Sequence, residues 1–360
     1  MKALVISVVS LLLVIIAVFV YFNWRGTGVY VIPSGQASAL PEVFTVAQDA
    51  KWYTIDNVQF GIDSTGGNAR ATTDGINNAL EWAKARGYEY IKFSQGTYLI
   101  QCTWNNRFVA PTDGILVPSG LTLDLGNSTF KIEDNRYSAY CIFGIVNQSD
   151  VTILGGTLIG DRDNHEYAPD PGSDTHEYGF GICVSASSNV LIQGVTIRDM
   201  TGDGVILEGS YDYISDGGAQ SENIKVYHCD ISNCRRQGVS VVGASDSEIA
   251  GNRIYDISGT APQFGIDVEP ELDFTVENVR IYGNTIYGCS GGAISCNKGA
   301  DYFVYSNICM GDSIIAFDCS NVQIYGNIIE TSLIRVYETA TDIAVYDNQL
   351  DFFSRIIKEN

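Results

Sequence analysis

The stretch SNVQIYGNIIETS (320–332) decides the fold, because related copies of it recur through the second half of the chain. Apolar and polar residues alternate along it, which is the pattern of a β-strand with one buried face. The copies are SNVLIQGVTIRDM (188–200), ENIKVYHCDISNC (222–234), DSEIAGNRIYDIS (246–258), ENVRIYGNTIYGC (277–289), DYFVYSNICMGDS (301–313) and TDIAVYDNQLDFF (341–353). Repeats this short, with no helical stretch between them, predict strands wound into a solenoid whose stacked turns share one core.

The alignment of these copies sets the register that we expect between successive turns. It makes seven positions equivalent, namely Val190, Ile224, Glu248, Val279, Phe303, Val322 and Ile343. The steps between them are 34, 24, 31, 24, 19 and 21 residues. The insertions in the longer steps should therefore form loops between coils.

A second strand in each repeat starts at a glycine, in FGICVS (180–185), DGVILE (203–208), QGVSVV (237–242), FGIDVE (264–269) and GGAISC (291–296). Side chains alternate between the two faces of a strand. The first and third residues after each glycine should therefore point inward, and the second and fourth toward solvent. Glu208, Asp267 and Glu269 fall at the outward positions, where the strand needs them for neither packing nor pairing.

An asparagine recurs at the other corner of the repeat, at Asn252, Asn284, Asn307, Asn327 and Asn348. Asparagine tolerates the left-handed backbone conformation of a sharp turn and can bond the backbone locally. We expect these residues to stack as a structural ladder.

Composition narrows the range of partners. A net charge of −21 over 360 residues argues against nucleic acid or an anionic membrane surface, and disfavours a polyanionic substrate unless cations bridge the two. The nine cysteines show no C-x-x-C pair and are expected to be buried thiols of the core. A disulfide in an oxidising compartment stays open as an alternative.

The amino terminus carries an apolar run at residues 3–22, preceded by Lys2. Its 20 residues are enough for one bilayer crossing. The sequence therefore predicts a transmembrane anchor over residues 1–23 and a tether over 24–45, with the body held outside the cytoplasm. Cleavage at Ala37-Ser38-Ala39, which would make the protein secreted, is the alternative.

Residues 46–110 differ from the repeats. The segment TDGINNALEWAKARGY places Ile76, Leu80 and Ala83 on one helical face and ends at Gly87, so we expect a helix over 72–86 with threonines as its cap. The open apolar end of a solenoid needs a cover, and this helix is suited to it. The β-helix itself is expected over 111–360, in about ten coils.

The segment GIDSTGG…TTDGINNALEWAKARGYEYIKFSQGTYLI, followed by VPSGLTLDLG and the repeats, resembles the pectin-lyase-like right-handed parallel β-helix superfamily. The resemblance covers residues ~50–360 and implies an all-β, right-handed, single-stranded parallel β-helix with an N-terminal capping helix. The chain is also similar to uncharacterised bacterial and phage β-helix proteins, including tail-spike-like depolymerases. In polygalacturonases the active site uses N-T-D, D-D, G-H-G and R-I-K motifs, for which this chain offers a counterpart at Asp203. FGIDVEPE resembles the Y-G-F-D-P-H-E strand of alginate epimerases, with Asp267 matching the aspartate, Phe264 replacing the tyrosine and the histidine missing.

Charged residues of successive coils should meet on one outward surface. Asp267, Glu269, Asp203 and Glu208 are the candidate catalytic residues. Glu208 and Glu269 have the same strand offset two coils apart, about 9.6 Å at the parallel-strand spacing, and carboxyl groups roughly 6.5–9.5 Å apart suit an inverting glycosidase. Arg235, Arg236 and Gln237, at the corner between them, are candidate substrate-binding residues. The alternative is that these acids are solvated surface residues.

The insertion 161–179 adds His165, His176, Glu177 and Tyr178 as further candidates for substrate binding. Asp161 and Asp163 could bind a calcium ion, although an Asp-x-Asp pair in a loop more often forms a turn. No cofactor is expected to be required.

Taken together, the residues and the resemblance predict a surface-tethered carbohydrate-active enzyme that cleaves a polysaccharide, with hydrolysis favoured because acidic residues outnumber basic ones at the proposed site. A polysaccharide lyase or epimerase is one alternative, kept open by Arg235 and Arg236. A non-catalytic glycan-binding or structural β-solenoid is the other. The sequence leaves the oligomeric state open.

Overall fold

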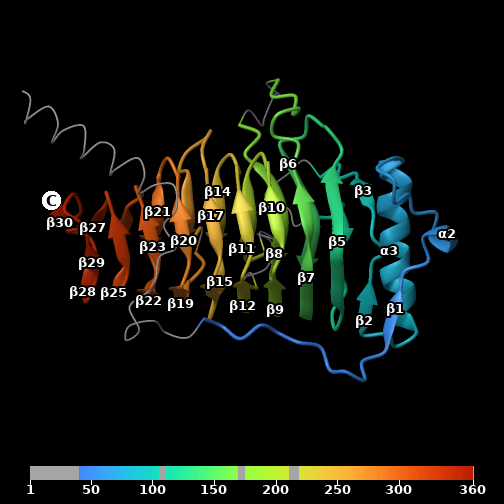
Figure 1. Ribbon diagram of the computed structural model, residues 1–360, viewed down its shortest axis with the longest axis horizontal. Coiled ribbons are helices and arrows are strands. Elements are labelled where there is room, and N and C mark those ends of the chain that lie inside the picture. Colours follow the sequence, from blue (N-terminus) through green and yellow to red (C-terminus); the bar gives the residue numbers. More distant parts are fainter. Residues whose placement is uncertain (1–39, 105–110, 169–174, 211–218, 272, 360) are drawn as a thin grey trace, which may run out of the picture. The chain divides into compact units, whose positions relative to one another are not determined.

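The computed structural model describes residues 40–104, 111–168, 175–210, 219–271 and 273–359. In this part the chain winds into stacked coils whose strands pair in parallel, so the predicted all-β parallel β-helix is confirmed (Figure 1). The expected membrane segment 3–22 lies outside the described residues. Among the residues that are described, no helix is both long and apolar enough to cross a membrane.

The smaller of the two sheets takes one strand from each coil. Its strands, in spatial order, are β4 (Ile115–Leu116), β6 (Ala139–Val146), β8 (Tyr178–Ser185), β11 (Asp203–Glu208), β14 (Gln237–Val241), β18 (Phe264–Val268), β21 (Gly292–Asn297), β24 (Ile314–Phe317), β27 (Leu333–Tyr337) and β30 (Arg355–Glu359). The glycine-led strands of the sequence are the middle members of this sheet.

The larger sheet contains two rows of strands. The first row is β1 (Trp52–Thr54), β2 (Tyr90–Lys92), β5 (Thr122–Ile132), β7 (Ser149–Ile159), β9 (Ser188–Gln193), β12 (Ser221–Tyr227), β16 (Glu248–Ala250), β19 (Glu277–Tyr282), β22 (Ala300–Tyr305), β25 (Ser320–Tyr325) and β28 (Thr341–Tyr346), with β15 (Ala244–Ser245) beside β12. The second row is β3 (Thr97–Ile100), β10 (Thr196–Arg198), β13 (Asp230–Ser232), β17 (Arg253–Tyr255), β20 (Thr285–Tyr287), β23 (Ile308–Met310), β26 (Ile328–Glu330) and β29 (Gln349–Leu350), and the long β5 and β7 pair in both rows. Each coil therefore has three strands where the sequence pattern suggested two.

The strand register corrects the expected alignment at two positions. Val190 lies beside Ile224, and Val322 beside Ile343, as expected. Glu248, however, pairs with Lys225 and Arg280, and Phe303 pairs with Arg280 and Gln323. The inward positions in these coils belong instead to Ser247 and Tyr302, both 0% exposed. A one-residue slip reverses the face of every side chain, so the expected alignment would have buried Glu248.

The predicted asparagine ladder is confirmed, with one change in its backbone geometry. Each asparagine of the series donates from Nδ2 to Oδ1 of the asparagine on the next coil, at 2.9–3.0 Å, from Asn252 through Asn284, Asn307 and Asn327 to Asn348. The same Oδ1 also accepts the backbone N–H of the preceding asparagine. The left-handed conformation belongs to the residue before each asparagine, for example Gly283 (φ 64°) and Ser306 (φ 55°).

The helices gather at the amino-terminal end of the stack. After the short α2 (Asn57–Phe60), α3 (Ala69–Ala85) begins three residues before the expected start and packs Ile76, Leu80 and Ala83 against β3 and β4 (Figure 1). The expected threonine cap is wrong. Thr73 lies within the helix, where its hydroxyl donates to the Ala69 carbonyl and accepts the Gln101 N–H, so it ties α3 to the end of β3. Pairing in the larger sheet already starts at β1, ahead of the expected start at 111.

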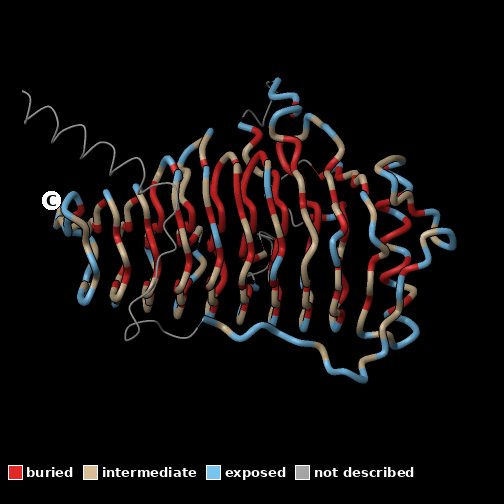
Figure 2. The backbone as a smooth tube through the Cα atoms, viewed as in Figure 1, coloured by how far each residue is buried: buried red, intermediate tan, exposed pale blue. Residues whose placement is uncertain are grey.

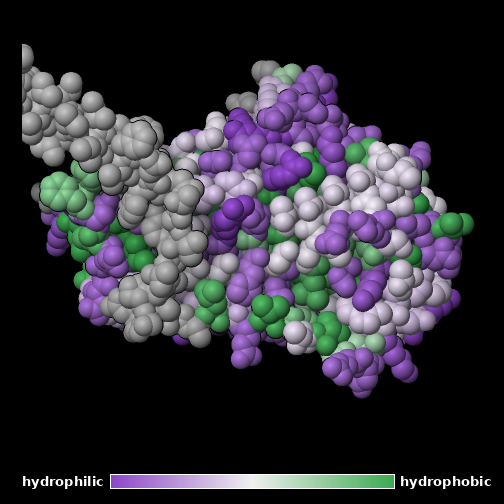
Figure 3. Space-filling model, in the orientation of Figure 1, coloured by the Kyte–Doolittle hydropathy of each residue, from purple (hydrophilic) through white to green (hydrophobic). Residues whose placement is uncertain are grey.

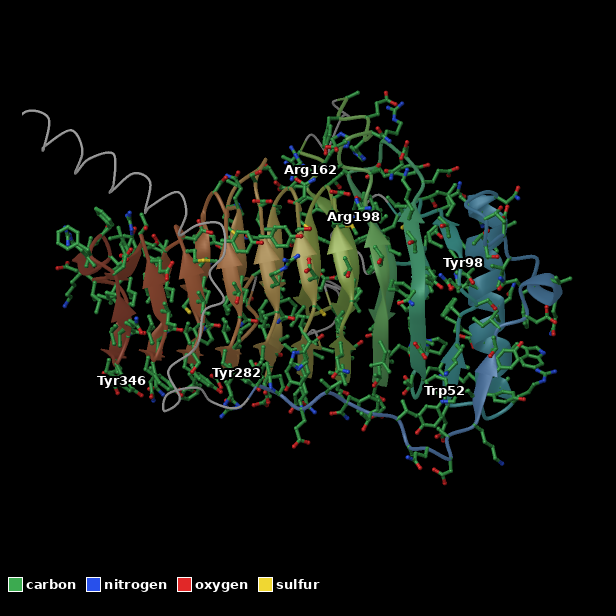
Figure 4. The ribbon with its side chains drawn as sticks, viewed as in Figure 1. Trp52, Tyr98, Arg162, Arg198, Tyr282 and Tyr346 are labelled. Carbon is green, nitrogen blue, oxygen red and sulfur yellow. The ribbon has the colours of Figure 1, made fainter. Side chains whose placement is uncertain are left out.

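Figure 2 shows the buried residues concentrated inside the coils. The core is built of stacked isoleucine, valine and leucine side chains, and all nine cysteines are buried free thiols. Outside the core, the rings of Tyr282, Tyr305, Tyr325 and Tyr346 stack at 4.9–5.0 Å along one edge (Figure 4). Equivalent positions on successive coils thus stack on one another both inside and outside the core.

Replacing Asn327 by alanine should lower the free energy of unfolding by about 2–3 kcal/mol, because it leaves the buried Asn307 N–H without its acceptor and removes the side-chain bond to the Val304 carbonyl. Urea denaturation measures this. As a control, Asn164→Ala removes an exposed hydrogen bond to Asp134 and should change the free energy by less than about 0.5 kcal/mol. Equal effects of the two substitutions would show that the ladder contributes no special stability.

Candidate functional site

The candidate residues lie on the outer face of the smaller sheet, on and directly after its central strands. Asp203 of β11 is in register with Gln237 of β14. Ser240 of β14 is in register with Asp267 of β18, and Asp267 with Ser295 of β21. The fold therefore brings together residues that are up to 92 positions apart in the sequence, over four adjacent strands.

A buried ion pair forms one side of this group. The Arg236 guanidinium lies 2.9 Å from Asp203 Oδ2, which also accepts a hydrogen bond from the Ser240 hydroxyl at 2.8 Å. Burial alone would lower the pKa of Arg236, but attraction from Asp203, Glu177 and Asp267 outweighs it, and the pKa is raised. Arg236 is thus a fixed cation at the centre of several carboxylates.

Asp267 lies against this pair with 3% of its surface exposed. Burial, with repulsion from Glu269, raises its pKa to about 7, against the opposing effects of a hydrogen bond from Ser295 and the charge of Arg236. Gln237 fixes one of its oxygens: the amide oxygen accepts the Phe264 N–H at 2.7 Å, so Nε2 must face Asp267 Oδ2, at 2.5 Å. A carboxyl group that holds a proton near neutral pH is a suitable general acid.

The expectation that these acids face solvent is wrong for three of the four. They do project away from the core, yet Asp203 is 0%, Glu208 1% and Asp267 3% exposed. Neighbouring side chains cover the sheet here. The Phe274 ring, for example, occupies the space beside Gly209 and Gly243 that a β-carbon would need. Glu269 is half-buried and accepts a hydrogen bond from Asn297 at 2.9 Å.

Leu207, which precedes Glu208, and Val268, which precedes Glu269, are both in register with Val241. The two glutamates therefore occupy equivalent positions, as predicted. The carboxylate of Glu208 accepts a hydrogen bond from the Cys183 thiol at 3.3 Å. Its surroundings therefore differ from those of Asp267, which is bordered by charged and amide groups.

The two histidines of the insertion form a separate buried chain of hydrogen bonds. His165 Nδ1 lies 2.8 Å from Asp161 Oδ2, His165 Nε2 lies 2.9 Å from His176 Nδ1, and His176 Nε2 lies 2.9 Å from the Ala168 carbonyl. Asp161 Oδ2 also accepts the Asn135 N–H at 3.0 Å. A carbonyl oxygen can only accept, so His176 Nε2 donates to Ala168, and the two rings link this carbonyl to the Asp161 carboxyl group.

Arg235 belongs to this second group. Its guanidinium donates to the carbonyl oxygens of Thr175 and His176, and lies 4.8 Å from the centre of the Tyr167 ring. The structure therefore gives Arg235, His165 and His176 a role in holding the insertion, where the sequence suggested substrate binding. Gln237, too, has both ends of its amide engaged within the protein.

The end of the insertion does reach the site. Glu177 and Tyr178 are half-buried, and both lie close enough to Arg236 to influence its pKa. The insertion projects from one edge of the coils, and Figure 3 shows hydrophilic residues gathered there. Among the described residues of the insertion, these two therefore lie near the Arg236–Asp203 pair.

The expected metal ligands are not brought together. Asp161 is engaged with His165, and Asp163 is exposed. Across the described ranges, no group of three or more His, Cys, Asp and Glu side chains is arranged to hold a metal ion.

A polar pocket of ≈ 350 Å³ lies beside the amino-terminal side of the insertion, and sequence reasoning did not find it. Gln101, Glu133, Asn135, Tyr137 and Glu166 are among its lining residues. Tyr137 precedes β6, which pairs with β8, so the pocket is one coil away from Tyr178. The polar run EDNRYS (133–138) between two strands was the available signal.

Replacing Asp267 by asparagine should stabilise the fold increasingly as the pH rises. The folded-state pKa of about 7 lies above the unfolded value of about 3.9, so the parent loses stability between these pH values by up to about 4 kcal/mol, and the variant does not. Denaturation of both proteins at pH values from 4 to 8 measures the difference. As a control, the exposed Asp318→Asn should differ from the parent in free energy of unfolding by the same amount at every pH. If Asp267→Asn also differs from the parent by a constant amount, the raised pKa of Asp267 is refuted.

Comparisons with known proteins agree with this architecture. Residues 217–351 match the family model described as a right handed beta helix region. The chain is 33% identical over 296 residues to YclG, an uncharacterised protein of Bacillus subtilis strain 168, covering 77% of this chain and 49% of YclG. The chain thus spans about half the length of this relative.

Two solved structures share the fold at low sequence identity. A 1,3-alpha-1,4-beta-D-galactose-4-sulfate-3,6-anhydro-D-galactose-2-sulfate 4 galactohydrolase superposes with a TM-score of 0.60 and 10% identity, over 89% of this chain and 94% of its own. The A-module of an Azotobacter vinelandii mannuronan C-5 epimerase superposes with a TM-score of 0.58 and 17% identity, over 83% and 77% of the two chains. On its stacked parallel strands and these matches, the chain has the fold of right-handed parallel β-helix proteins.

Proposed function

We propose that this protein is a carbohydrate-active enzyme that hydrolyses a polysaccharide, with Asp267 as the general acid. The observation that carries the proposal is the burial of Asp267 against Glu269, which raises the pKa of Asp267 to about 7. Both solved relatives act, by their printed names, on polysaccharides, and this supports the substrate class.

Glu269 is the proposed general base. It follows Asp267 by two residues on the same side of the strand, which separates their Cα atoms by about 6.6 Å. An inverting glycosidase needs carboxyl groups roughly 6.5–9.5 Å apart, with room for a water molecule. Asp267 would donate its proton to the glycosidic oxygen as the bond to the anomeric carbon breaks. A water molecule would form the new bond to that carbon and transfer its proton to Glu269, and exchange with solvent would restore both groups.

The remaining residues of the site would orient this pair. Gln237 holds Oδ2 of Asp267, and Asn297 holds Oε1 of Glu269. Arg236, bound to Asp203, is not available as the base of a lyase. An elimination reaction would instead reveal itself through unsaturated products.

A screen of polysaccharides for released reducing ends and unsaturated products tests the proposal. On any substrate that the parent degrades, Asp267→Asn and Glu269→Gln should each lower kcat by about 10²–10⁴, the usual contribution of general acid–base catalysis. The parent's activity should fall as the pH rises through about 7, where Asp267 loses its proton.

Asp318→Asn, on an exposed turn, is the matched control and should keep full activity. Full activity of both site variants would place the chemistry elsewhere. Retained glycan binding without turnover by the parent would favour the non-catalytic alternative.

We also propose that residues 3–22 anchor the enzyme in a membrane, with the β-helix outside the cytoplasm. The uninterrupted apolar run after Lys2 supports this. Full-length protein should fractionate with membranes and resist extraction by carbonate. Recovery of a soluble protein that starts near Leu40 would show cleavage after Ala37-Ser38-Ala39 instead.

A further inference from the structure

Arg236, whose charge acts on the proposed acid, is already paired with Asp203. Arg236 is held 2.9 Å from Asp203 Oδ2, and its side chain is 10% exposed. Its electrostatic surroundings also include Glu177 and Asp267. Arg236 therefore has more negative charge around it than it can balance, and offers little to an anionic ligand.

The neighbouring arginine is also occupied. Arg235 donates to two backbone carbonyls of the insertion and packs on the Tyr167 ring. In the part of the chain that the structure describes, no ion pair joins a Lys or Arg to Asp267 or Glu269. The local potential at these carboxyl groups is therefore negative.

The groups around Asp267 point the same way. After burial, the largest influence that raises its pKa is the charge of Glu269, and Asp203 adds to it. A sugar carboxylate or sulfate placed beside Asp267 would be repelled by the same charges. It would also have to lose its hydration without gaining a cationic partner.

We propose that the sugar units bound against Asp267 and Glu269 carry no carboxylate or sulfate, so that the substrate is a neutral glycan. This inference rests on the proposed function. The half-buried Glu269 carboxylate and the Tyr178 hydroxyl suit sugar hydroxyl groups, which can donate and accept hydrogen bonds. The galactohydrolase with the same fold is named for a sulfated galactan, so the two proteins would differ in the charge of their substrates.

Glycan pairs that differ only in charge test the inference. The probes are an oligogalacturonide and its carboxyl-reduced form, and a sulfated galactan oligosaccharide and its desulfated form, with mannan and chitin oligosaccharides as further neutral ligands. Binding is measured by calorimetry with full-length Asp267→Asn protein, which should bind without turnover. The neutral member of a pair should bind at least about tenfold more tightly than the charged member.

Salt and a second substitution separate electrostatics from shape. Affinity for a neutral member should not depend on ionic strength, whereas rejection of the charged member should weaken at high salt. Adding Glu269→Gln removes one negative charge and should reduce the ratio of the affinities for the neutral and the charged member about threefold. The distant Asp318→Asn should leave this ratio unchanged.

Tighter binding of a charged member, or binding that strengthens as salt is lowered, would overturn the inference, and so would a failure of every neutral glycan to bind. If the parent degrades an anionic polysaccharide and Asp267→Asn abolishes this, the proposed function stands and the inference on charge fails. If the parent degrades no glycan at all, the proposed function fails as well.

Discussion

Stacking of each coil on the next at the spacing of parallel strands is the constraint on which this structure depends. It places like residues on one another, because every coil must satisfy its backbone through its two neighbours. The asparagine ladder is the clearest case. One side-chain oxygen accepts both the backbone N–H and the side-chain amide of the preceding coil, so a sharp corner is closed without leaving a buried polar group unpaired.

The same stacking makes the candidate site stiff. Asp203, Ser240 and Asp267 stand on neighbouring strands whose relative positions are fixed by backbone pairing, and hydrogen bonds from Ser240 and Gln237 connect them. A polar group built on paired strands needs little reorganisation to act, because its donors and acceptors are already oriented. Burial then supplies the low polarity that keeps a proton on Asp267.

Local sequence pattern was enough for the stacked parallel strands and the ladder, since each follows from the repeat. It could not give the burial of the site. Asp267 alternates with inward residues as an exposed residue would, and its cover comes from other coils and from the insertion. The roles of Arg235 and His165 were misjudged for the same reason, because their partners are backbone carbonyls and a buried imidazole that no periodicity reveals. The slip at Glu248 shows a further limit: a short strand with few apolar residues fits two registers almost equally well.

The site is also costly for the fold. A buried arginine–carboxylate pair seldom repays its desolvation, and a neighbouring acid with a raised pKa destabilises the protein wherever it ionises. In the same outward row as Ser240, Asp267 and Ser295, β11 holds Ile206 and β24 holds Ile315, and apolar residues there carry no such cost. Folding alone therefore gives no reason for the charges to gather over β11, β14 and β18. A group of residues that opposes stability, yet is linked by hydrogen bonds and fixed on rigid strands, is better explained by chemistry performed on a ligand than by the architecture that carries it.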